Sequence, residues 1–192
     1  MAKVAVLTYG RLRETAGHPQ VQEFLDRTPH NFDVAERSDG FLGRSGLRTE
    51  NGTVVWGDRT VFPLNTDMEQ PVAATLSLWA DLESVVAFAY AADHGEALAK
   101  RKDWFIKGDW PATVVWWVDD EQTPDWADAK QRHAHMHARG ASAYAFDFKH
   151  SFGPDGQEIE LDRAKIKAKI QQNAANRRET DAPAGGPILW QV

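Results

Sequence analysis

Ala112–Val118, with the sequence ATVVWWV, has the strongest strand character in the chain. Its residues are mostly β-branched or aromatic, the types that suit a pleated, half-buried surface. Lys3–Tyr9 (KVAVLTY) and Val72–Trp79 (VAATLSLW) share this character and are also predicted to be strands. Phe41–Arg48 is predicted to be a weaker strand, and Ala143–Phe148 (AYAFDF) a further one.

Helices are predicted to alternate with these strands. Apolar or small residues recur at spacings of three and four over Pro19–Arg37, which indicates a helix with one buried face. Pro29 lies inside this segment, so we expect a kink or restart there, with Thr28 as N-cap. Two further helices are predicted, one from Leu82 to about Phe105 with a break near Gly95, and one over Pro124–Arg139.

Turns, a long loop and a tail complete the chain. Asn51-Gly52 is typical of a tight hairpin turn. Gly57–Pro71 has no periodicity and contains two prolines, so it is predicted to be a long loop. The composition changes from Gly153 onward, and Ile159–Arg178 is predicted to be a solvated, largely basic helix. We therefore divide the chain into a domain at residues 1–152 and a helical or extended tail at residues 153–192.

This order of elements predicts an α+β fold of the ferredoxin-like type. Such a fold is an antiparallel sheet with helices on one face. The other face of the sheet is then apolar and uncovered. A second copy of the chain is the simplest partner for that face, so a homodimer is expected.

Composition and charge exclude several classes of protein. The chain of 192 residues has no cysteine, which excludes disulfides, thiolate metal sites and cysteine nucleophiles. We expect a reducing compartment, the cytoplasm, because the first residues also lack a signal-peptide pattern. The net charge of −6 argues against nucleic-acid binding. No apolar run approaches the ~18 residues of a membrane span.

Short motifs give little support to the common active sites. The chain has no Gly-x-Gly-x-x-Gly, Gly-Lys-Ser/Thr or Gly-x-Ser-x-Gly pattern, which argues against a dinucleotide site, a P-loop and a hydrolase nucleophile elbow. The run His133–His137 (HAHMH) places two histidines four residues apart on one helix face. A zinc site needs three or four ligands, so we predict no metal site and expect His133 to be semi-buried.

The eight tryptophans are the unusual feature of the composition. Trp116 and Trp117 should point to opposite faces of their strand, so that one packs under the helices and the other faces the open side of the sheet. A pocket walled by such rings suits a flat, apolar or aromatic small molecule. The alternative is an aromatic-rich core. The predicted substrate-binding residues are Trp79, Trp104, Trp116, Trp117 and His133.

Three ordered stretches make the chain similar to a known family. They are FLD at 24–26 with AERSDGF at 35–41; LSLW at 76–79 with FAY at 88–90, His94 and KRKDWF at 100–105; and VWWV at 115–118 with Thr123-Pro124, Ala129, Arg132 and AFDF at 145–148. Over residues 3–152 the chain resembles the bacterial domain-of-unknown-function family 3291. The resemblance implies a dimeric α+β barrel, a fold shared with antibiotic-biosynthesis-type monooxygenases. The chain departs from the family at Thr75-Leu76-Ser77, where Asn-Met-Ser is usual, and at His133, where Leu is usual.

His94 is the candidate catalytic base. Tyr90 precedes it by four residues and Arg101 follows it by seven, so a continuous helix places all three on one face. A histidine can take up a proton near neutral pH. Tyr90 can orient it or donate to an oxygen that gains charge, and Arg101 can hold an anionic group of the substrate. The alternative is a histidine satisfied by its neighbours, with no catalytic role.

These residues predict an enzyme that acts on an aromatic or polyketide-like small molecule without a tightly bound cofactor. His94 removes a proton, and the resemblance favours monooxygenation over cyclisation or isomerisation of the resulting anion. Two alternatives stay open: a haem-binding barrel protein with His94 as axial ligand, and a non-catalytic ligand-binding or interaction domain. The expected partners are the substrate and a second copy of the chain, with no nucleic acid and no membrane.

Overall fold

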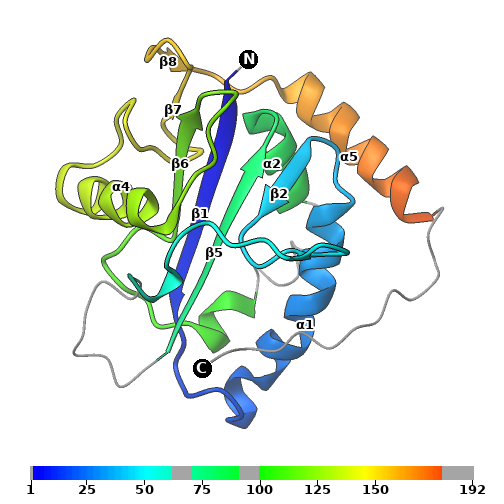
Figure 1. Ribbon diagram of the computed structural model, residues 1–192, viewed down its shortest axis with the longest axis vertical. Helices are drawn as coiled ribbons and strands as arrows, with labels where there is room; N and C mark the ends of the chain where they lie inside the picture. Colours follow the sequence, from blue (N-terminus) through cyan, green and yellow to red (C-terminus); the bar gives the residue numbers. More distant parts are fainter. Residues whose placement is uncertain (1, 62–70, 91–99, 179–192) are drawn as a thin grey trace.

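The main sheet has the strand order of a ferredoxin-like fold. The computed structural model describes residues 2–61, 71–90 and 100–178. Four antiparallel strands lie in the order β2-β5-β1-β6 (Figure 1). The connections β1-α1-β2 and β5-α2-β6 each skip one strand, which is the split β-α-β arrangement. The predicted α+β fold with a ferredoxin-like antiparallel sheet is therefore confirmed.

The elements follow the predicted alternation, with small hairpins added. The strands are β1 (Lys3–Arg11), β2 (Phe41–Arg44), β3 (Arg48–Thr49), β4 (Gly52–Thr53), β5 (Val72–Trp79), β6 (Thr113–Val118), β7 (Ser151–Phe152) and β8 (Glu158–Ile159). The helices are α1 (Pro19–Glu36), the 3-10 helix η1 (Arg59–Val61), α2 (Leu82–Ala89), α4 (Trp126–Arg139) and α5 (Arg163–Arg178). The β3–β4 pair confirms a hairpin here, but its turn is Glu50-Asn51, one residue before the predicted Asn51-Gly52, and Gly52 begins β4.

Helix α1 continues through Pro29 without a restart. Its N-cap is His18, whose Nδ1 accepts a hydrogen bond from the backbone N–H of Gln20 at 3.2 Å. Thr28 lies inside the helix and donates its hydroxyl to the carbonyl of Phe24 at 2.7 Å. The predicted restart with Thr28 as N-cap is therefore wrong. Pro29 removes one helical hydrogen bond, and burial of the helix's apolar face offsets that loss.

Of two predicted strands, one is shorter than expected and the other is not formed. β2 ends at Arg44, four residues before the predicted end at Arg48. The predicted strand Ala143–Phe148 is not formed; this segment makes only isolated bridges, one of them from Phe146 to Val115 of β6. Alternating aromatic and small residues favour an extended backbone, but the segment follows the edge of β6 at one residue pair only.

Alternation along β1 gives the sheet two buried faces. Val4 and Val6 point to one face, where they pack with Ala35 of α1 and with Leu82 and Val85 of α2. We call this the α1/α2 face. Helices α1 and α2 thus cover one face of the sheet, as expected for a ferredoxin-like fold.

The opposite face is covered by the same chain. It carries Ala5, Leu7 and Tyr9 of β1, and we call it the α4 face. Its covering residues are Trp126, Ala129 and Met136 of α4, together with Trp56 and Val61. The prediction that this face is uncovered is therefore wrong. Burial of the sheet gives no reason for a second copy of the chain, and the homodimer stays a prediction.

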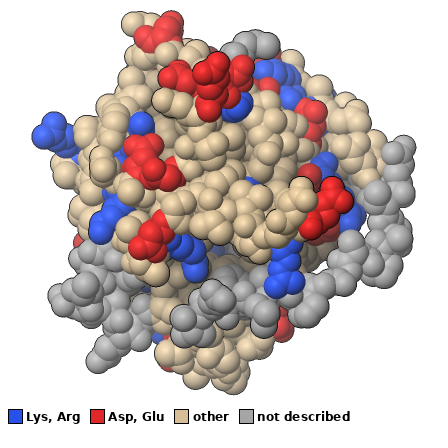
Figure 2. Space-filling view, viewed as in Figure 1, with Lys and Arg blue, Asp and Glu red and all other residues tan. Residues whose placement is uncertain are grey.

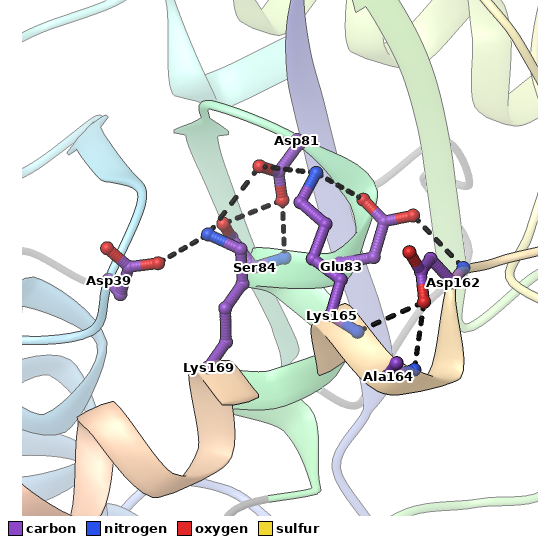
Figure 3. A network of polar contacts seen from close by, with 8 residues as sticks. All are labelled: Asp39, Asp81, Glu83, Ser84, Asp162, Ala164, Lys165 and Lys169. Atoms are coloured by element: carbon purple, nitrogen blue, oxygen red, sulfur yellow. Dashed lines mark hydrogen bonds and ion pairs between the residues drawn. The ribbon is translucent and has the colours of Figure 1, made fainter. Parts of the chain in front are cut away.

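Helix α5 docks on α2 through charged groups (Figure 3). Lys165 Nζ lies 3.2 Å from Asp81 Oδ2 and 3.1 Å from Glu83 Oε2. Lys169 forms an ion pair with Asp39, and its Nζ lies 3.6 Å from Asp81 Oδ2. These ion pairs contribute to holding α5 on α2. Asp81, at the start of α2, is the shared carboxylate of the network.

We expect this docking to weaken in acid. Burial acts to raise the pKa of Asp81, but hydrogen bonds from Ser84 and Lys165 and the charge of Lys169 outweigh it, so the pKa lies below its ordinary value. A carboxyl group with a lowered pKa contributes stability above its unfolded pKa of about 4, and that contribution is lost as the pH falls through the lower folded value. The amide NMR signals of α5 should therefore begin to shift below about pH 4.

The Asp81→Asn variant is the control for this titration. It should show shifted α5 signals already at neutral pH, because the carboxylate is absent throughout. Wild-type α5 signals that stay constant through the titration of Asp81 would show that the charge network does not hold the helix.

The surface in Figure 2 has no single-sign stripe on the face it displays: Lys and Arg are interspersed with Asp and Glu around a broad uncharged area. Among the described helices, none is long and apolar enough to cross a membrane.

Candidate functional site

The structure places three of the predicted pocket tryptophans in the core. Trp79, Trp104 and Trp116 are all buried. Trp79 stacks on Phe88 with ring centroids 5.3 Å apart and donates its Nε1–H to the hydroxyl of Ser77 at 2.9 Å. These rings hold the helices on the sheet, as the alternative of an aromatic-rich core predicted.

Trp117 differs from the other three because it is only half-buried. It donates its Nε1–H to the carbonyl of Phe152 at 2.6 Å. With Trp116 it lines a surface hollow of about 300 Å³ at the edge of β6, beside Asp128 and Arg132. Arg132 there is already paired with Asp128 through Nε at 2.9 Å, so its charge is compensated inside the protein.

Of the predicted catalytic group of Tyr90, His94 and Arg101, the two residues that the structure describes, Tyr90 and Arg101, do not lie on one continuous helix. α2 ends at Ala89, and Tyr90 is its non-helical C-cap, 69% exposed to solvent. Arg101 lies in a separate helical turn at residues 100–104 and is exposed. His94 lies outside the described residues. The helix expected to run on from Leu82 to a break near Gly95 ends earlier, at Ala89. Tyr90 and Arg101 are therefore not aligned by one helix.

His133 lies in a buried cluster at the end of β1. It comes from α4 and is 0% exposed. Its ring centroid lies 4.5 Å from that of Tyr9 and 5.0 Å from that of Trp110. Its Nε2 is 2.9 Å from the carbonyl oxygen of Pro111. A sheet residue, a helix residue and the segment before β6 thus meet at one imidazole.

The hydrogen bond to Pro111 fixes the tautomer of His133. A carbonyl oxygen only accepts, so Nε2 must carry the proton and the neutral ring keeps its lone pair on Nδ1. Burial lowers the pKa of His133; the bond to Pro111 opposes this, and a positive charge on His137 would lower the pKa further. His133 is therefore a neutral imidazole at pH 7, with Nδ1 as its basic atom.

Tyr9 shows the opposite shift. It is 8% exposed, and burial raises the pKa of its phenol, against the opposing charge of Arg11. Tyr9 therefore stays protonated at neutral pH. The pKa values of these two contacting side chains are thus shifted in opposite directions, so that His133 is a neutral base and Tyr9 a neutral acid. Such opposite shifts recur in acid–base active sites.

Ring contacts lead from this pair to the surface. Trp110, which is half-buried, stacks on His133 and also on His137, with centroids 3.9 Å apart and planes 14° from parallel. His137 is exposed, and its Nδ1 lies 3.2 Å from the carbonyl oxygen of Asp109. The buried pair is thus connected to solvent by two flat rings. The described residues contain no group of three or more His, Asp or Glu side chains that could hold a metal ion.

The buried imidazole should make stability depend on pH. Because the pKa of His133 is lower in the folded state than its ordinary value of about 6.5, the unfolded chain binds the proton first as the pH falls. Stability should therefore fall below about pH 6.5, until the folded ring also becomes protonated. Urea denaturation of wild type and His133→Gln at several pH values checks this. The free energy of unfolding should change less with pH in the variant than in wild type, and an equal change in both would contradict the prediction.

Sequence reasoning identified His133 but not its partners. Tyr9 and Arg11 have only one local signal, their spacing of two on a predicted strand, which places both side chains on one face. Trp110 directly precedes a proline and a strand, a position that gives no hint of contact with a distant helix. Only the packing of α4 on the sheet brings these residues together.

Two comparisons found similar proteins, and neither names an activity. The family model described as Domain of unknown function (DUF3291) matches residues 3–162. A solved structure, a DABB family protein with a ferredoxin-like fold from Mesorhizobium loti, is similar over 64% of this chain and 100% of its own. That similarity has 10% sequence identity and a TM-score of 0.38. Among curated proteins, none matches the sequence.

Proposed function

The chain belongs to the family described as Domain of unknown function (DUF3291), a description that names no activity. We therefore propose a function from the buried pair of Tyr9 and His133. The protein is a small-molecule enzyme that removes a proton from a flat, aromatic or polyketide-like compound without a tightly bound cofactor. The observation that carries this proposal is the 4.5 Å ring contact between two buried side chains that stay neutral as base and acid.

The two side chains have complementary roles. His133 accepts the proton on Nδ1, because Nε2–H remains bonded to Pro111. Tyr9 donates its hydroxyl hydrogen bond to the substrate oxygen that gains negative charge as the C–H bond breaks. Trp110 is the half-buried ring beside the pair. We propose that a flat substrate displaces it and stacks in its place.

Oxygenation is the specific form of this reaction that we propose. The carbanion formed by loss of the proton reduces dioxygen, and the organic product gains one oxygen atom while the second leaves as water. In this form the substrate supplies all four electrons that reduce O₂, including the two that a cofactor would otherwise provide, so no reduced cofactor is needed. Cyclisation or isomerisation would begin with the same proton transfer and differ only in what the anion does next. Such chemistry is compatible with the cytoplasm, the place of action that we propose.

Anthrone is a suitable probe for both parts of the proposal. It is flat, aromatic and has an acidic CH₂ group, and its oxidation by one O₂ gives anthraquinone and one water. Wild-type protein should accelerate exchange of the CH₂ protons in D₂O and should accelerate O₂ uptake. Exchange without faster O₂ uptake would support the base and contradict oxygenation. No acceleration of either process would contradict the proposed function.

The other sequence-based hypotheses have less support. A base or a haem ligand at His94 concerns a residue outside the described part of the chain. His133 does not fit as a haem ligand through Nε2, because that atom is bonded to Pro111 and the ring is packed against Tyr9 and Trp110. All residues of the proposed site come from one chain, so the reaction does not require the homodimer.

A further inference from the structure

Arg11 is the charged side chain closest in sequence to Tyr9 of the proposed acid–base pair. It lies two residues after Tyr9 on β1, so both side chains point to the α4 face. Residues two apart on a strand lie about 7 Å apart along it, and the positive charge of Arg11 acts to lower the pKa of the Tyr9 phenol. The Nε–H of Arg11 is buried and has no hydrogen-bond partner among the described residues.

Within the part of the chain that the structure describes, the charge of Arg11 has no compensating carboxylate. Among residues 2–61, 71–90 and 100–178, no carboxylate forms an ion pair with it. Arg44 and Arg132, also partly buried, are each paired with a carboxylate, Glu36 at 2.8 Å and Asp128 at 2.9 Å. A buried donor of a charged group that lacks an acceptor is costly. Arg11 is thus an exception among the partly buried arginines of the described residues. A bound anion would accept its hydrogen bond and remove the free-energy cost of the unpaired buried donor.

We propose that Arg11 holds the anionic group of the ligand at the Tyr9–His133 site. The substrate class is then a flat compound that carries a carboxylate or an acidic enol beside the carbon that loses its proton. The planar guanidinium offers two parallel N–H donors to such a group, and its charge stabilises the enolate as it forms. This inference rests on the proposed function, because it places the anion at the same site.

Benzoate and benzamide test this proposal, because they have nearly the same shape and differ in charge. Binding is measured by tryptophan fluorescence, and its location by the ring NMR signals of His133. Wild type should bind benzoate at least about tenfold more tightly than benzamide, the ratio expected for one charge-assisted hydrogen-bond pair. Arg11→Gln should bind the two compounds equally. Arg13→Gln, which removes an exposed charge two residues further along, should keep the preference.

The possible failures are distinguishable. If both compounds bind wild type equally and shift the His133 signals, the anion proposal is overturned while the proposed site stands. If benzoate is preferred through Arg11 but the His133 signals do not move, Arg11 binds anions away from the pair; the anion proposal is then overturned, and the anthrone assay alone decides the proposed function. If neither compound binds, the anion proposal is overturned. Should Arg11→Gln not fold, Arg11→Lys replaces it. This variant should retain a preference for benzoate over benzamide that is smaller than in wild type, and a preference equal to that of wild type would overturn the anion proposal.

Discussion

Replacing His133 by Gln is expected to slow deuterium exchange and oxidation of anthrone by at least about a hundredfold, the lower range for loss of a positioned general base. The Gln amide can still donate to the Pro111 carbonyl, so the buried hydrogen bond is retained. It has no basic nitrogen, however, and cannot accept a proton. The variant thus separates the chemical role of the imidazole from its role in packing. Rates per enzyme are compared after the folded fraction of each protein has been measured.

Two other histidines serve as controls for this result. His135 lies on the same helix but contacts Ser142 and Tyr144, away from the proposed site, so His135→Gln should react like wild type. His94→Gln tests the base that the sequence alone suggested. If His94→Gln loses the activity and His133→Gln keeps it, the base is His94 and the site proposed at His133 is wrong. If His133→Gln loses only stability, the pair with Tyr9 is a core contact.

Replacing Trp126 by Ala is expected to lower the free energy of unfolding by about 3–5 kcal/mol, the usual loss for a buried large aromatic side chain. Trp126 is 2% exposed and packs α4 onto the sheet. Its Nε1–H donates to the hydroxyl of Ser45 at 3.0 Å, and its backbone N–H to the carbonyl of Trp56 at 3.0 Å. Truncation would leave a cavity on the α4 face and free the Ser45 hydroxyl. Urea denaturation measures the change.

Tyr90→Ala is the matched control for this prediction. It removes an aromatic side chain that is 69% exposed, so stability should change by no more than about 0.5 kcal/mol. A loss below about 1 kcal/mol for Trp126→Ala would contradict the conclusion that α4 covers the sheet.

The order of elements could be read from the sequence because local patterns determine it. β-branched runs predicted β1, β5 and β6, and spacings of three and four predicted α1. The surface against which α4 packs could not be predicted in the same way. Its apolar face predicts burial, but the period of a helix does not say which surface it covers. The expectation of an uncovered sheet, and of a second copy to cover it, arose from this gap.

The candidate site shows the same division. His133 is prominent in the sequence because it begins the HAHMH run and stands where the similar family usually has Leu. Tyr9 and Arg11 lie in a strand far from it in sequence, where a tyrosine reads as an ordinary core residue. Tyr90, by contrast, was placed with His94 and Arg101 by assuming that one helix continued from α2. Helix ends are set by capping and tertiary contacts, so that assumption had no support beyond spacing.

The most direct test of His133 as the base is the pH dependence of kcat/KM for anthrone, measured beside the NMR titration of the His133 ring. The value of kcat/KM reports ionisation of the free enzyme. Its acidic limb should coincide with the titration of His133, below about pH 6.5, because protonation of Nδ1 removes the base. A rate that stays constant through the titration of His133, or that follows the titration of another histidine, would contradict the assignment.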